Sequence, residues 1–145
     1  MTVKNPTPAT HDVSNTTLPF PVARTSLAIL GTSLGLNLLI WAGALLAGAD
    51  FEVSRAGAEP MTVGAVTIAL MTVAPLLLGG VVLALATRRS PRALTVLGWL
   101  GLAIGILTAP MPFTMLAGTG TQVALAAMHV VTGVVWWLAL RRSSQ

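Results

Sequence analysis

The chain has 145 residues, of which 54% are hydrophobic and only 8% are charged, and its mean hydropathy is +0.84. A soluble domain carries about 25% charged residues. So few charges cannot cover a water-exposed surface, so the composition excludes an ordinary soluble domain and indicates a single membrane domain. The net charge is +4, but the basic residues lie in short segments beside apolar runs, which argues against a nucleic-acid-binding protein.

The first part of the chain differs from the rest. Residues 1–22 are mostly polar, contain four prolines and show no apolar period. This pattern predicts a disordered cytoplasmic tail. Residues 23–142 are predicted to form the transmembrane domain.

Four continuous apolar runs follow the tail. Crossing the ~30 Å hydrocarbon core takes about 20 helical residues, and unbroken apolar runs distinguish helices from the alternating strands of a barrel. The short connections between the runs force neighbouring helices to be antiparallel. We therefore predict an all-α fold, an integral membrane, antiparallel four-helix transmembrane bundle, with spans at about 25–48, 62–87, 93–109 and 122–140.

The basic residues predict the orientation of this bundle. Seven of them fall on one side of the predicted spans, and only Arg55 falls on the other, so the positive-inside rule places the tail, the loop TRRSPR and the C-terminus in the cytoplasm. Three of the four acidic residues lie in the outer loop between the first two spans. The seven cytoplasmic basic residues are Lys4, Arg24, Arg88, Arg89, Arg92, Arg141 and Arg142.

A cleaved signal peptide is a competing interpretation of the first span. Ala47-Gly48-Ala49 has the A-x-A form of a cleavage site. The apolar run before it is longer than the usual 7–15 residues of a signal peptide and contains Asn37. Cleavage would leave three spans with the N-terminus outside, and this alternative stays open.

Small residues form stripes on two of the predicted helices. Gly31, Gly35 and Ala42 share one face of the first span, and small residues at this spacing let another helix approach closely. Ser33 and Asn37 lie on roughly the opposite side, so the first span is predicted to pack between two neighbours. The third span has a similar packing face, formed by Gly98, Gly101 and Gly105.

Asn37 and His129 lie near the middle of the first and last spans. Polar side chains are costly in hydrocarbon and need partners. Pro75 lies in the middle of the second span, where it predicts a kink and frees the carbonyl of Met71. The simplest arrangement is a polar contact layer at mid-depth, in which Asn37 and His129 bond across a helix interface or to that carbonyl.

The last span carries a polar and small stripe that we expect to face the bundle interior. Its members are spaced three, four and seven residues apart. The stripe consists of Gln122, Ala126, His129, Gly133 and Trp136.

The sequence has tryptophans near the ends of the predicted spans. Trp41, Trp136 and Trp137 occupy positions that are typical of interfacial aromatics.

His129 has two interpretations. A neutral imidazole can hold two helices together, which contributes about 1 kcal/mol or less. It can also relay protons or contact a substrate, because histidine titrates near neutral pH. A proton path normally includes a carboxylate, and no predicted span contains Asp or Glu.

Motifs for catalysis or cofactor binding are absent from the sequence. There is no cysteine, no H-E-x-x-H, no G-x-S-x-G and no P-loop, and the two histidines lie far apart. We therefore predict no catalytic residue, no metal site, no cofactor and no enzymatic activity.

Several short segments resemble an uncharacterised actinobacterial family of small four-helix integral membrane proteins, a domain of unknown function. The resemblance covers about residues 25–140 and implies a four-span plasma-membrane protein, without supplying an activity. It also places Asn37, Pro75 and His129 in a shared pattern. The segments that carry it are the Asn37-containing span, Gly48-Ala-Asp-Phe-Glu-Val53, Thr62-Val-Gly-Ala65 with Pro75 downstream, and Leu125-Ala-Ala-Met-His-Val130.

Two functions follow as hypotheses. The first is a non-enzymatic structural or accessory subunit of the bacterial plasma membrane, which acts through helix packing. Its partners would be the lipid bilayer and either further copies of the chain or another membrane protein. The alternative is a small-solute or proton-linked transporter that works as an oligomer, because four spans enclose little room for a pathway. A water-accessible cavity that reaches His129 would favour the transporter.

Overall fold

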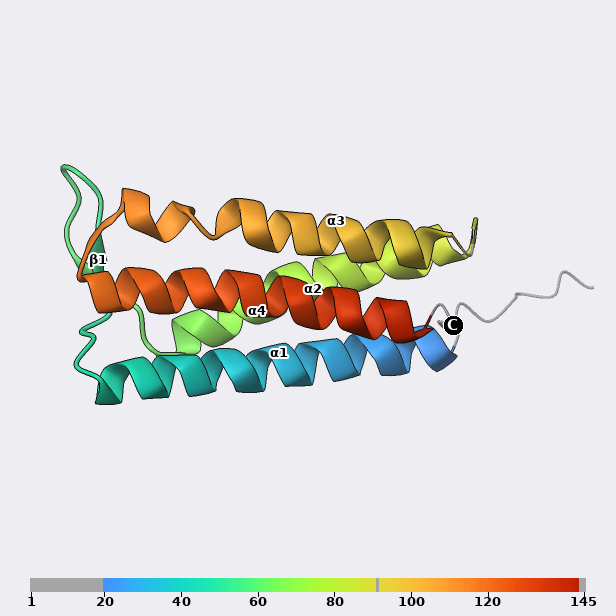
Figure 1. Cartoon of the computed structure of the whole chain (residues 1–145), viewed down its shortest axis with the longest axis horizontal. Coiled ribbons are helices and arrows are strands. Elements are labelled where there is room, and N and C mark those ends of the chain that lie inside the picture. The colour runs from blue at the N-terminus through green and yellow to red at the C-terminus, as the bar shows by residue number, and fades with distance from the viewer. Residues whose placement is uncertain (1–19, 91, 144–145) are drawn as a thin grey trace, which may run out of the picture.

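The computed structural model describes residues 20–90 and 92–143, so the predicted tail lies outside the described residues up to residue 19. Four α-helices make up most of this part of the chain. They are α1 (Phe20–Leu46), α2 (Ala65–Thr87), α3 (Ala93–Thr108) and α4 (Thr119–Ser143). Four helical segments are long and apolar enough to cross a membrane, as the sequence predicts, and the third of them includes the 3₁₀ turn that follows α3. The chain reverses direction from each helix to the next (Figure 1).

The helix ends differ from the predicted span limits for local reasons. Helix α1 is described from Phe20, a few residues before the predicted start of the first span. Helix α2 begins at Ala65 because Met61 and Thr62, a few residues earlier, pair with another strand. Helix α3 has 16 residues, about 24 Å of helix. A 3₁₀ turn, η1 (Met111–Thr114), extends it toward the length of a membrane span.

A small three-stranded sheet joins the two long loops at one end of the molecule. It contains β1 (Glu52–Ser54), β2 (Met61–Thr62) and β3 (Leu116–Ala117). The central strand β1 is antiparallel to both neighbours, with Val53 opposite Met61 on one side and Ala117 on the other. The sheet therefore ties the α1–α2 loop to the α3–α4 loop, whereas the sequence pattern predicts both only as connections.

Phe51 fixes the sheet against the helices. Its φ of 54° lies in the left-handed region, which is uncommon outside glycine, and its side chain is only 1% exposed. The Phe51 N–H donates to Thr121 Oγ1 at 3.0 Å, and the Thr121 hydroxyl donates to Asp50 Oδ1 at 3.0 Å. Because Thr121 lies in the first turn of α4, this chain of bonds anchors the beginning of the α1–α2 loop to α4.

Helix α4 occupies a central position, in contact with both α1 and α3, while α2 packs on α1 (Figure 1). Two apolar clusters form the core. One lies near the sheet and contains Phe51, Ile68, Ala124 and Met128. The other lies toward the opposite end and contains Ile29, Leu76, Leu83, Trp136 and Leu140.

Candidate functional site

Asn37 links three helices at a level between the two apolar clusters. It is 3% exposed, and its amide nitrogen donates to Thr72 Oγ1 of α2 at 3.0 Å and to Thr132 Oγ1 of α4 at 3.1 Å. Thr72 lies between the cluster residues Ile68 and Leu76, so the polar contact interrupts the apolar packing of α2. These three side chains, Asn37, Thr72 and Thr132, form what we call the polar layer.

The order of residues along the helices produces this layer. In α2, Thr72 is one turn from a residue of each apolar cluster, and in α4 Thr132 stands four residues from Met128 and four from Trp136. Residues four apart share a helix face. The polar positions therefore point into the same interior as the apolar residues that flank them.

A row of buried polar atoms without partners continues from the layer along α1. Ser33 Oγ, Asn37 Oδ1 and Trp41 Nε1 are buried and have no hydrogen-bond partner among the described residues. The three residues are four apart, so they lie on one side of the helix. An unsatisfied buried polar group costs about 1–3 kcal/mol, which makes this row a feature that packing alone does not explain.

The unpaired atoms offer complementary hydrogen-bonding groups. The indole nitrogen of Trp41 is a donor, the amide oxygen of Asn37 is an acceptor, and the Ser33 hydroxyl can be either. Such a set can hold water-sized polar molecules, which normally bind two to four polar groups when buried. We call these three residues, Ser33, Asn37 and Trp41, the α1 polar row.

His129 lies outside the polar layer. Its Nδ1 donates to the carbonyl of Leu125 at 2.8 Å, one turn earlier in its own helix, and the side chain is half-buried. The hydrogen bonds of Asn37 go to Thr72 and Thr132 instead. The structure therefore brings Asn37 together with Thr132, which lies about one turn after His129 in α4. Helix α4 contributes the Thr132 hydroxyl to the polar layer, and not the imidazole.

The other two predicted polar contacts are also placed away from the layer. Pro75 lies inside α2 but is exposed, on a different side of the helix from the buried Thr72 and Leu76. Gln122 is half-buried in the first turns of α4, where its Nε2 donates to the carbonyl of Met115 at 3.0 Å. Gln122 therefore holds the η1–α4 connection against the helix.

The glycines of α3 form a tight seam with α4. A Cβ at Gly105 would lie 2.7 Å from the backbone oxygen of His129 and 2.9 Å from the Cα of Gly133. Such distances require the backbones to separate. Gly101 contacts the ring of Trp136, and a Cβ at Gly98 would lie 3.6 Å from the Cβ of Leu140. We call this contact the α3–α4 seam.

The glycines of α1 are placed differently. A Cβ at Gly31, Gly35 or Gly43 would meet nothing within 4 Å, and all three positions are exposed. Gly31 and Gly35 are four residues apart and lie on one side of the helix, which we call the open α1 face. At these two positions, the predicted packing stripe of the first span has no neighbouring helix in the described chain.

The tryptophans occupy different environments. Trp136 is 8% exposed and donates from Nε1 to the carbonyl of Leu97 at 2.8 Å, so it belongs to the core. The ring centroids of Trp137 and Trp99 are 5.2 Å apart. The guanidinium carbon of Arg141, near the end of α4, also lies 5.2 Å from the Trp137 ring centroid. The half-buried Trp41 packs near Phe51, with ring centroids 6.4 Å apart.

Groups that could bind a metal are not found in the described residues. No set of three or more His, Cys, Asp or Glu side chains comes together in residues 20–90 and 92–143. The described carboxylates are Asp50, Glu52 and Glu59, all in or beside the sheet at one end of the molecule. The polar layer and row consist of uncharged groups, which can bind a ligand by hydrogen bonds but supply no acid or base.

Sequence reasoning missed Thr132 and the unpaired nitrogen of Trp41. A signal for the row exists, because Ser33, Asn37 and Trp41 recur every four residues along α1. For Thr132 the signal is weaker, since the helix also contains Thr121 and His129 as polar candidates.

Comparisons with known proteins place the chain among relatives without assigning an activity. A search of curated proteins and a search of solved structures give no match. One family model, described as a family of unknown function (DUF6069), matches residues 17–145, which include all four helices and the sheet. The chain is therefore a member of the DUF6069 family of unknown function.

Proposed function

We propose that the protein is a non-enzymatic, multi-pass membrane subunit that acts by packing against another membrane-embedded helix. In this proposal the four helices form an antiparallel transmembrane bundle in a bacterial plasma membrane. The observation that carries it is the open α1 face, where a Cβ at Gly31 or Gly35 would meet nothing within 4 Å, whereas the glycines of α3 pack against α4.

The exposed surface supports membrane embedding. Large apolar side chains are exposed on all four helices, for example Leu39 at 69%, Leu70 at 62% and Leu107 at 77%. Exposure of such an apolar surface to water is unfavourable, whereas lipid tails solvate it without this free-energy cost. In lipid, helices associate through close van der Waals packing rather than through the hydrophobic effect, and small residues let the two backbones approach closely enough for it.

The distribution of charge supports an orientation with both termini in the cytoplasm. Arg24 and the residues Arg88, Arg89 and Arg92 belong to the same end of the molecule as the C-terminal end of α4 (Figure 1). The three described carboxylates lie at the sheet end together with Arg55. The excess of arginine near span ends is the feature that sets orientation.

Co-purification in mild detergent tests this function. We expect a second membrane protein, or a second copy of the chain, to accompany the wild-type protein in native mass spectrometry. The double variant Gly31→Ile/Gly35→Ile should lose that partner while keeping its thermal stability, because the added side chains meet open space.

The matched control changes exposed alanines on other helices, Ala74→Ile/Ala103→Ile. It adds similar bulk outside the open α1 face and should keep the partner. A wild-type protein that purifies as a lone monomer, or a glycine variant that keeps its partner, would contradict the proposal.

A small-solute or proton-linked transporter, acting as an oligomer, is the second candidate, and the α1 polar row favours it. Three unpaired polar atoms in line along one helix are a feature that a pathway for water or a small polar solute would use. The close approach of Gly105 to the backbone of His129 opposes a pathway on that side of α4. Flux measurements on the protein in proteoliposomes, with and without a proton gradient, decide between the two functions.

A further inference from the structure

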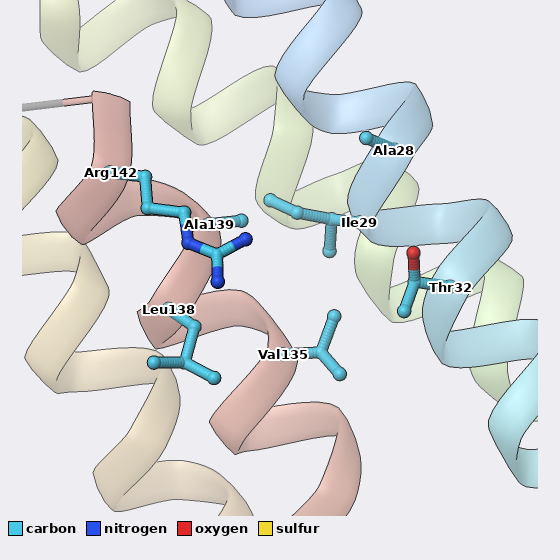
Figure 2. Close-up of a pocket in the computed structure, with 7 residues that line it drawn as sticks. All are labelled: Ala28, Ile29, Thr32, Val135, Leu138, Ala139 and Arg142. Atoms are coloured by element: carbon cyan, nitrogen blue, oxygen red, sulfur yellow. The ribbon is translucent and has the colours of Figure 1, made fainter.

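A groove of about 210 Å³ lies between α1 and α4, near the start of α1 and the end of α4 (Figure 2). The lining from Val135 to Arg142 covers about 10 Å along α4 at 1.5 Å per residue. Most of the lining is apolar, and Thr32 is the one uncharged polar side chain in it. The apolar lining residues are Ala28 and Ile29 from α1 and Val135, Leu138 and Ala139 from α4.

The side chain of Arg142 places a positive charge at one end of this apolar groove. The side chain of Arg142 extends from the last turns of α4 toward the gap between the two helices (Figure 2). Thr25 Oγ1 and Ser143 Oγ lie 3.2 Å apart, so the first turns of α1 meet the end of α4 there. Arg24, one turn before the lining residue Ala28, adds a second positive charge near the same end.

The described part of the chain places no carboxylate at this end. Asp50, Glu52 and Glu59 are all at the sheet end. The two adjacent arginines are placed differently. The guanidinium carbon of Arg141 lies 5.2 Å from the ring centre of Trp137, whereas Arg142 lines the groove. Arginine binds phosphate through two parallel hydrogen bonds, which a planar guanidinium at the edge of an apolar groove can offer.

We propose that this groove binds one anionic phospholipid of the cytoplasmic leaflet, with an acyl chain between α1 and α4 and its phosphate on Arg142. The proposal rests on the membrane embedding and orientation given under the proposed function. An apolar channel with a cation at its cytoplasmic end matches the two halves of such a lipid. Basic pockets between membrane helices on the cytoplasmic side recognise anionic headgroups in this way.

The test compares phosphatidylglycerol with phosphatidylcholine, each titrated in mixed micelles with the full-length protein. Native mass spectrometry counts the lipids retained, and thermal unfolding reports the stabilisation. We expect phosphatidylglycerol to be retained at one site and to raise the Tm more than phosphatidylcholine does. Loss of the paired phosphate contact in Arg142→Gln should weaken retention by about tenfold.

Two matched controls separate the site from general attraction. Arg89→Gln removes the same charge from the same end of the molecule but outside the groove. It should leave retention within about twofold, since an exposed charge outside the groove makes no paired contact with the bound phosphate. Ala28→Leu fills the groove and should reduce retention, whereas Ala74→Leu adds the same bulk on α2 and should not.

Five results would overturn the proposal. The first three are equal retention of the two lipids, equal effects of Arg142→Gln and Arg89→Gln, and an Ala28→Leu variant that retains the lipid fully. Stabilisation by inorganic phosphate alone to the same extent would also do so, because the acyl chain would then contribute nothing. A second protein chain in the groove would overturn it too, and would appear as a dimer whose mass depends on Ala28 but not on lipid.

These outcomes are distinct from failure of the proposed function. The partner test is measured as a protein mass, whereas the lipid test is measured as a lipid mass. Arg142→Gln separates the two best, because Arg142 lies on α4, whereas Ala28 shares one side of α1 with Gly31 and Gly35. A protein that binds the lipid as expected but purifies without a partner would leave this site intact and remove the subunit function.

Discussion

The glycine faces of α3 and α1 look alike in sequence and behave differently in the fold. At the α3–α4 seam, a Cβ at Gly105 would lie 2.7 Å from a backbone oxygen, so glycine is required for the two helices to approach. On the open α1 face, a Cβ at Gly31 or Gly35 would meet nothing within 4 Å. The comparison teaches that a small-xxx-small pattern marks the capacity for close approach, while the rest of the fold decides whether that capacity is used within the chain.

The largest expected effect comes from breaking the seam. Gly105→Val should destabilise the fold by about 3 kcal/mol or more, because overpacking against backbone atoms forces α3 away from α4. Thermal unfolding in detergent, followed by circular dichroism, measures the loss. Gly31→Val is the matched control and should change stability by less than about 0.5 kcal/mol. Equal losses in the two variants would mean that the glycine faces do not differ.

An intermediate effect is expected on the inner side of α1. Asn37→Leu removes the bonds to Thr72 and Thr132, and also removes the unpaired Oδ1, so the net loss should be about 1 kcal/mol. Unfolding of the variant is compared with that of Thr95→Leu, which changes an exposed polar residue of α3 and should have no effect. A stable Asn37→Leu variant would show that α1 is held by its apolar contacts alone.

The smallest effect should come from His129. Its Nδ1 bonds to a carbonyl of its own helix, so His129→Leu should cost less than about 1 kcal/mol. Seam stability then comes from backbone proximity at Gly105 and Gly133 rather than from the imidazole. A variant that keeps its fold but loses a proton-driven flux in proteoliposomes would assign His129 to transport.

The four helices could be predicted from the sequence, because a continuous apolar run of about 20 residues is typical of a membrane-spanning helix. The spacing of Asn37 from Ser33 also placed Asn37 on an interior face. The partners of Asn37 could not be predicted, since a small rotation of α4 decides whether His129 or Thr132 faces α1. The sheet was missed because strands of two or three residues, such as Met61–Thr62, are too short to show a period.

The choice between used and unused glycines was also beyond the sequence. Gly98, Gly101 and Gly105 follow the same spacing logic as Gly31 and Gly35. What separates them is the large ring of Trp136 and the absent side chain of Gly133 on the facing helix, and nothing in α3 itself indicates that α4 presents them there.

The three-stranded sheet makes the two ends of the molecule differ in how α1 and α4 are held together. At the sheet end, two antiparallel ladders and the buried Phe51 join both helical hairpins, and any movement there must break backbone hydrogen bonds. At the other end, side chains of the described residues hold α1 and α4 together: the apolar cluster that includes Ile29 and Leu140, and the hydroxyl groups of Thr25 and Ser143. Any change in the spacing of α1 and α4 would therefore be largest beside Arg142, where a bound molecule would have the greatest effect on that spacing.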